Sequence, residues 1–69
     1  MTYCSSLTDT QVKNVLIDEA NRINGIEDRT SKVREAAEDL YFEAREELAK
    51  RGINANIVLF EAGVNKPKR

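Results

Sequence analysis

The stretch SKVREAAEDLYFEAREELAKRG, residues 31–52, decides the fold of this 69-residue chain. Its apolar residues recur every three or four positions, which is the spacing of residues on one face of an α-helix. Lys50 and Arg51 suit the negative end of the helix dipole, and Gly52 can end the helix in the left-handed conformation. The pattern predicts a helix over residues 31–51, with an apolar face of Val33, Ala36, Ala37, Leu40, Tyr41, Ala44 and Leu48.

The segment before it carries an equally clear helix start. Thr8 and Gln11 have the spacing of a capping box, and Leu7 and Val12 have that of a hydrophobic staple. We predict a helix over residues 9–24 that Gly25 ends in the left-handed conformation, with an apolar stripe of Val12, Val15, Leu16, Ala20 and Ile23. The short polar connection 25–29 makes the two helices an antiparallel hairpin, and Asp28 or Thr30 is the expected N-cap of the second.

The segment after Gly52 allows two interpretations. Asn54 can cap a helix and Gly63 can end it, which favours a short third helix over residues 55–62. Residues 57–60, IVLF, are however rich in strand formers, so a C-terminal strand at 56–61 in an α+β fold stays open. We expect an all-α single domain over residues 1–64, followed by a mobile basic tail, 65–69.

The amino-acid composition excludes several kinds of catalytic and binding site. The chain has 11 basic and 12 acidic residues, one cysteine and no histidine, so Ser-His and Cys-His nucleophiles are excluded. Its three glycines lie too far apart for a phosphate-binding loop, and no apolar run is long enough to span a membrane. We therefore expect a non-catalytic cytoplasmic protein that uses no cofactor or metal, does not enter a membrane and does not read DNA directly.

Apolar residues outside the two stripes indicate an interface. Phe42 lies opposite Val33 on the second helix, and Ile17 is displaced from the stripe of the first. Ile57 and Phe60 belong to a run whose side chains point in every direction around a helix. Either Tyr3 or the third segment covers Phe42 within the chain, or a second copy covers these residues. The leading hypothesis is a self-associating protein-interaction module, a homodimer or small homo-oligomer.

Four carboxylates form a ridge beside the apolar stripe of the second helix: Glu35, Asp39, Glu43 and Glu46. Like charges one turn apart cost a helix roughly 0.2–0.5 kcal/mol per pair, which suggests a use other than stability. One hypothesis is a small inhibitor or adaptor, of the size that phages and mobile elements encode. It would dock this ridge, centred on Phe42, onto a larger protein with a basic surface that handles nucleic acid. The alternative is a solvated helix face.

Three cations surround the expected start of the second helix, where the dipole also favours anions: Arg29, Lys32 and Arg34. They indicate a second alternative function, the capture of a small anionic ligand such as a nucleotide.

Glu19 is unusual for a different reason, because this carboxylate lies between Val15 and Ile23 on the apolar side of the first helix. We expect its carboxylate to reach solvent or, if it points inward, to pair with Tyr41 or Arg45.

Overall fold

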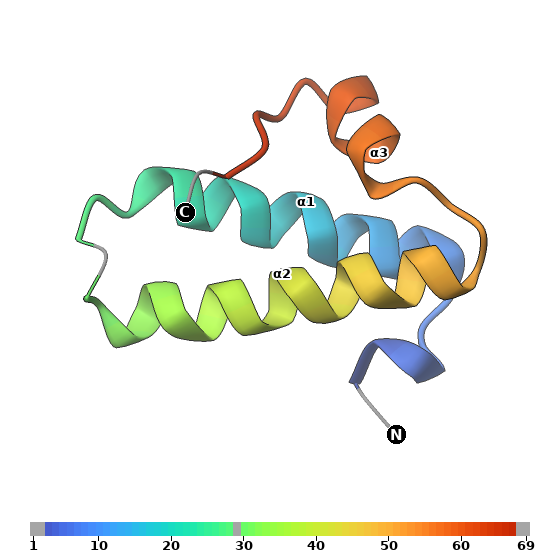
Figure 1. The fold of residues 1–69 in the computed structure, drawn as a ribbon, viewed down its shortest axis with the longest axis horizontal. Helices are drawn as coiled ribbons and strands as arrows, with labels where there is room; N and C mark the ends of the chain where they lie inside the picture. The colour runs from blue at the N-terminus through green and yellow to red at the C-terminus, as the bar shows by residue number, and fades with distance from the viewer. Residues whose placement is uncertain (1–2, 29, 68–69) are drawn as a thin grey trace.

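The computed structural model describes residues 3–28 and 30–67, which form four helical elements and no strand (Figure 1). A short 3-10 helix, η1 (Tyr3–Ser6), precedes α1 (Asp9–Gly25), α2 (Lys32–Lys50) and α3 (Ala55–Glu61). α1 and α2 run antiparallel side by side, with α3 beyond α1 and η1 on the opposite side against α2 (Figure 1). The all-α hairpin with a short third helix is confirmed, and the strand expected as the alternative at 56–61 is wrong.

The backbone is flattened, with extents of 32 × 28 × 16 Å along its principal axes. Its shortest extent is half of its longest.

Local signals position the helix ends. Thr8 Oγ1 accepts from the Gln11 N–H at 3.2 Å, and Gln11 Oε1 accepts from the Thr8 N–H at 2.9 Å, which confirms the capping box. Gly52 and Gly63 have φ of 77° and 71°, the left-handed conformation that ends α2 and α3. The same prediction is wrong for Gly25, which stays in α1. The chain leaves α1 through Ile26, whose extended conformation carries it into the loop.

The start of α2 differs from the expected cap. Ser31 Oγ accepts from the Val33 N–H at 3.2 Å and caps the helix. Asp28 and Thr30 bond to each other instead, because Asp28 Oδ1 accepts from the hydroxyl of Thr30 at 2.7 Å and from its N–H at 2.9 Å. These two hydrogen bonds hold the pKa of Asp28 below its ordinary value.

The core lies along the contact between α1 and α2 and continues beneath α3. Val12, Leu16, Ala20 and Ile23 of α1 are buried as predicted. On α2 the buried residues are Arg34, Ala37, Tyr41, Ala44 and Leu48, alternately three and four positions apart. Val33, expected in the core, is 61% exposed and Ala36 is also exposed, so those two assignments are wrong. The face of α2 that packs on α1 is therefore narrower than the apolar face expected from its sequence, and it lies on the side of the helix away from Val33.

Arg51, at the end of α2, ties the N-terminal segment to the hairpin. Its guanidinium donates to Glu47 at 2.8 Å, to Asp9 at 2.7 Å and to the carbonyl oxygen of Leu7 at 2.7 Å. The bonds to Glu47 and Asp9 raise the pKa of Arg51 above its ordinary value. This residue thus holds η1 and the first turn of α1 beside the last turn of α2.

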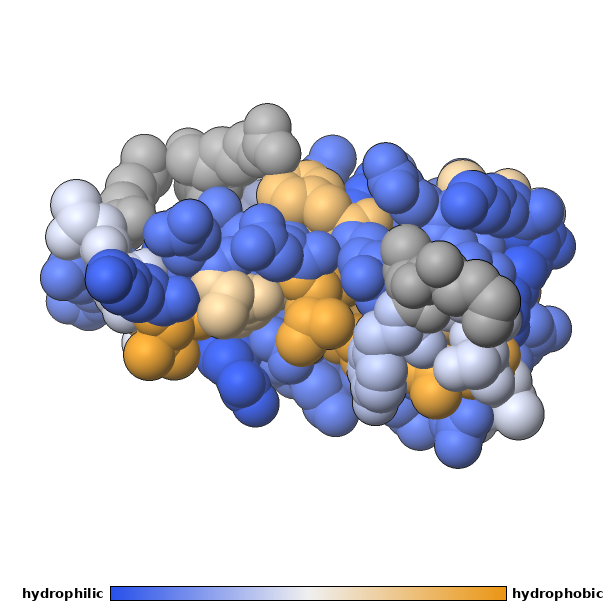
Figure 2. All heavy atoms as spheres, turned by 90° about the horizontal axis from the view of Figure 1, so that it is seen from below, coloured by the Kyte–Doolittle hydropathy of each residue, from blue (hydrophilic) through white to orange (hydrophobic). Residues whose placement is uncertain are grey.

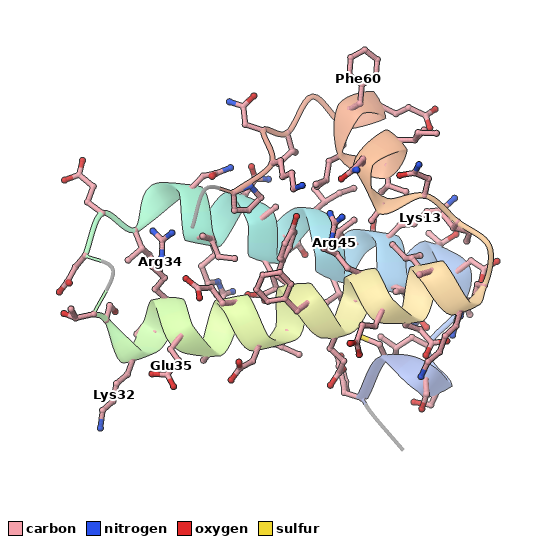
Figure 3. All side chains as sticks on the ribbon, viewed as in Figure 1. Lys13, Lys32, Arg34, Glu35, Arg45 and Phe60 are labelled. Atoms are coloured by element: carbon pink, nitrogen blue, oxygen red, sulfur yellow. The ribbon has the colours of Figure 1, made fainter. Side chains whose placement is uncertain are left out.

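Glu19 is 7% exposed, and no side chain or backbone group of the described residues donates to its Oε2. The nearest cation is Arg22, whose Nε lies 3.8 Å from that oxygen. The expectation of a solvent-facing carboxylate, or of pairing with Tyr41 or Arg45, is therefore wrong. Arg45 instead turns toward α3 (Figure 3).

No helix within residues 3–28 and 30–67 is both long and apolar enough to cross a bilayer.

Candidate interaction surface

α3 places two large apolar side chains on its outer face. Ala55, Val58 and Leu59 point into the core, whereas Ile57 is 54% exposed and Phe60 is 85% exposed. Figure 3 shows the ring of Phe60 pointing away from α1 and α2. Ile57 and Phe60 are three positions apart, so they lie on one side of the helix. We call this pair the α3 knob.

Polar contacts hold α3 in this orientation. Asn54 caps the helix, its side chain accepting from the Asn56 N–H at 2.9 Å. Arg45 of α2 donates both to the Tyr41 hydroxyl and to Asn56 Oδ1, each at 3.1 Å. Arg45 thus bridges α2 and the start of α3, and together with the burial of Val58 and Leu59 it holds α3 in the orientation that turns Phe60 outward.

Phe42, the expected centre of a docking face, is half-buried and packs against the core. Its ring meets that of Tyr41 edge-on, with centroids 5.3 Å apart and planes at 70°. This is a favourable aromatic geometry. Residues of the chain's own C-terminal segment, rather than Tyr3 or α3, lie across from it, because Pro67 and Phe42 line the same cavity.

That cavity, which we call the aromatic cavity, has a volume of about 290 Å³. Its apolar lining consists of Ile23, Tyr41, Phe42 and Pro67, and its charged lining of Glu38, Arg45 and Lys66. The C-terminal segment forms one side of it, anchored where Asn24 Nδ2 donates to the Asn65 carbonyl oxygen at 2.9 Å. Residues 65–67 of the expected mobile tail are therefore part of this surface, and residues 68–69 lie outside the described part of the chain.

Ile17 is half-buried rather than displayed. It lines a shallow groove between α1 and α3 together with Lys13 and Val58. α3 thus covers part of the side chain that was expected to meet a partner.

The acidic ridge is only partly assembled. Glu35, Asp39 and Glu46 are exposed on α2, but Glu43 is half-buried and accepts from the Cys4 N–H at 3.0 Å. η1 thus covers one of the four carboxylates, so the ridge is not exposed along its whole length. Figure 2 looks onto the side of the molecule formed by α2 and η1, where hydrophilic residues predominate and hydrophobic residues emerge between them.

Of the three cations expected to hold an anion, the two that the structure describes, Lys32 and Arg34, do not come together. Arg29 lies outside the described residues. Lys32 is exposed and points away from the hairpin, whereas Arg34 points toward the other end of the α1–α2 connection (Figure 3). Arg34 is 7% exposed and donates to the carbonyl oxygens of Ile26 at 2.7 Å and Ile23 at 3.4 Å, and to Glu38 at 2.9 Å. Its guanidinium is committed to the structure, so its assignment to an open anion site is wrong.

Cys4, the single thiol, lies in the core with no exposed surface. Burial, reinforced by the neighbouring carboxylate of Glu43, raises the pKa of the Cys4 thiol from 9.0 to about 11. Because only the thiolate is nucleophilic, the folded protein holds this group in its unreactive form near neutral pH.

A thiol-reactive disulfide reagent tests this state of Cys4. We expect the folded protein to react at least about 100-fold more slowly at about pH 8 than the urea-unfolded chain, because a two-unit difference in pKa lowers the thiolate fraction.

The thiol of the unfolded chain ionises first as the pH rises from 9.0 to about 11, so the free energy of unfolding falls in this window. The fall should be smaller in Cys4→Ala. Equal labelling rates in buffer and in urea would contradict the buried position.

Among residues 3–28 and 30–67, no three cysteine or carboxylate side chains converge in a way that could hold a metal ion. Comparisons of the chain with protein-family models, with curated proteins and with solved structures gave no match. The surface described above is therefore the basis for a functional proposal.

Proposed function

We propose that this chain is a non-catalytic protein-interaction module that self-associates through the α3 knob. The observation that carries the proposal is the 85% exposure of Phe60 beside the 54% exposed Ile57. Burying a phenylalanine side chain contributes roughly 1.5–3 kcal/mol, and aromatic side chains dominate the energetics of protein interfaces. A complex in which a partner covers the knob is stabilised by this free energy.

The size and shape of the chain support a second copy as that partner. A domain of about 60 residues buries only about 60% of the surface that its unfolded chain exposes, and small domains commonly gain stability by associating. The backbone is also flat, with a shortest extent of 16 Å against 32 Å for the longest. A second copy would cover the knob and bury further surface of this flat molecule at the same time.

The two alternative functions have less support from the geometry. Docking of the acidic ridge onto a basic protein would use Glu35, Asp39 and Glu46, but Glu43 is bound to η1 and Phe42 is half-buried. Capture of an anion would rely on Arg34, whose guanidinium already bonds Ile26 and Glu38. The α3 knob, by contrast, is exposed and makes no such contact with the described residues 3–28 and 30–67.

Sedimentation equilibrium over micromolar to millimolar concentrations, comparing the natural protein with Phe60→Ala, tests the proposal. We expect the natural protein to form dimers or small oligomers and Phe60→Ala to raise the dissociation constant at least about 30-fold, the effect of losing an interface hot spot. Alanine is a strong helix former, so α3 should persist in the variant.

The matched control is Val33→Ala, which truncates another exposed apolar side chain of a helix, 61% exposed and on α2 rather than α3. We expect it to associate like the natural protein. A natural protein that stays monomeric at millimolar concentration would refute self-association. A Phe60→Ala variant that associates like the natural protein would refute the role of α3.

A further inference from the structure

The α3 knob and the aromatic cavity belong to one continuous region of the surface. Lys66 lines the aromatic cavity on one side of the C-terminal segment. It also lines a groove together with Phe60 and Val64. The exposed ring of Phe60 and the aromatic cavity thus both border the same short segment of chain.

We infer that, in the self-association proposed above, Phe60 of each copy enters the aromatic cavity of the other copy. The assembly is a dimer with twofold symmetry, in which the contact of knob and cavity occurs twice. The inference rests on the proposed function and adds the surface that receives Phe60.

The dimensions of the cavity fit this occupant. Apolar cavities of about 150 Å³ bind a benzene molecule. The aromatic cavity has a volume of about 290 Å³, which leaves room for a phenyl ring and part of its backbone attachment. Phe60 cannot fill the cavity of its own chain, because its ring points away from α1 and α2 (Figure 3).

The chemistry of the lining also suits a phenyl ring. Tyr41 and Phe42 already meet edge to face, and because Phe42 is only half-buried, an incoming ring can add a further contact of this kind with it. Glu38, Arg45 and Lys66 add charged groups to the lining. An apolar centre with polar groups around it is typical of protein interfaces.

Symmetry favours a second copy over an unrelated protein. A twofold interface uses the same surface patch on both subunits, so the patch must contain both halves of each contact. The patch around Lys66 meets this requirement, because it holds the knob and the cavity together. A standard interface buries about 800 Å² per partner, which is about a sixth of the 4799 Å² that this chain exposes.

Filling the cavity tests the inference while leaving Phe60 intact. Lys66 is exposed and lines the cavity, so in Lys66→Trp the indole can occupy the space that the phenyl ring needs. We expect this variant to raise the dimer dissociation constant at least about tenfold. The matched control is Lys50→Trp, an exposed lysine at the end of α2, for which we expect a change below about twofold. Circular dichroism is the control that compares the helical content of both variants with that of the natural protein.

A second measurement locates Phe60 directly. In a dimer of isotopically labelled and unlabelled copies, intermolecular nuclear Overhauser effects should connect the Phe60 ring with the side chains of Tyr41, Phe42 and Pro67. Effects that connect Phe60 only with Phe60 or Ile57 of the other copy would mean that the knobs pack on each other.

The outcomes separate the two proposals. Weaker association in Phe60→Ala, with unchanged or stronger association in Lys66→Trp, overturns the cavity as the receiving surface and leaves self-association through α3 standing. An equal effect of Lys66→Trp and Lys50→Trp also overturns the cavity. A natural protein that remains monomeric overturns both proposals.

Discussion

Replacing Leu16 with alanine is expected to lower the free energy of unfolding by about 3–5 kcal/mol. Leu16 has no exposed surface and is one of the largest fully buried side chains, in the middle of α1 where it faces α2. Its truncation removes apolar contacts and leaves a cavity that the neighbouring helices only partly close. A domain of this length has a total stability of only roughly 3–10 kcal/mol, so the variant should lose at least about a third of it.

Urea unfolding followed by far-ultraviolet circular dichroism measures this loss. All variants must be compared at one low protein concentration, because association stabilises the folded state by mass action. The matched control is Val33→Ala, which removes apolar atoms from a residue that is 61% exposed. Its effect should stay within about 0.5 kcal/mol. A cost below about 1 kcal/mol for Leu16→Ala would contradict the packing of α1 on α2.

Replacing Arg34 with methionine is expected to cost about 2–4 kcal/mol of stability. Methionine retains most of the apolar stem but removes the donors to the Ile23 and Ile26 carbonyl oxygens and to Glu38. The Ile26 carbonyl group lies just past the last turn of α1, where backbone acceptors lack partners within the helix, whereas the Ile23 oxygen also accepts from the Ile26 N–H at 3.1 Å. The guanidinium of Arg34 therefore serves as a side-chain cap for α1 supplied by α2.

Two further variants separate charge from geometry at this position. Arg34→Lys keeps the positive charge but cannot bond the carbonyl oxygens and Glu38 together, so it should recover less than half of the loss. Lys32→Met removes a lysine that is exposed near the start of α2, and its effect should stay within about 0.5 kcal/mol. If Arg34→Met were as stable as Lys32→Met, the capping role of Arg34 would be refuted. Urea unfolding, at the concentration used for Leu16→Ala, is again the measurement.

Helix spans were the most predictable part of this molecule. The capping box of Thr8 and Gln11, the cap at Asn54 and the turns at Gly52 and Gly63 all formed as their local sequences indicate. Each signal acts through bonds between residues close in the chain, so it needs no knowledge of the rest of the fold. The errors at Gly25 and at the cap of α2 occur at the connection between the helices, where distant contacts of Arg34 hold the chain.

The candidate surface was less predictable, because exposure depends on what other elements cover. Phe42 and Ile57 were both expected at an interface, but Phe42 is half-buried whereas Ile57 is 54% exposed. Glu43 could not be distinguished from Glu46 by spacing, and only the docking of η1 separates them. The aromatic cavity had no sequence signal, since it joins Ile23, Phe42 and Pro67 from three distant segments.

By itself, the amino-acid sequence determined that the chain forms two long helices in a hairpin, because capping, periodicity and turn residues act locally; it left residues 55–62 open between a short helix and a strand. The tertiary structure alone decided how far each helix is rotated about its axis, and hence that Arg34 is buried and Phe60 is exposed. Successive residues differ by about 100° around a helix, so a rotation smaller than this exchanges core for surface. That rotation follows from the sum of contacts between α1, α2, α3 and η1, which no single segment contains.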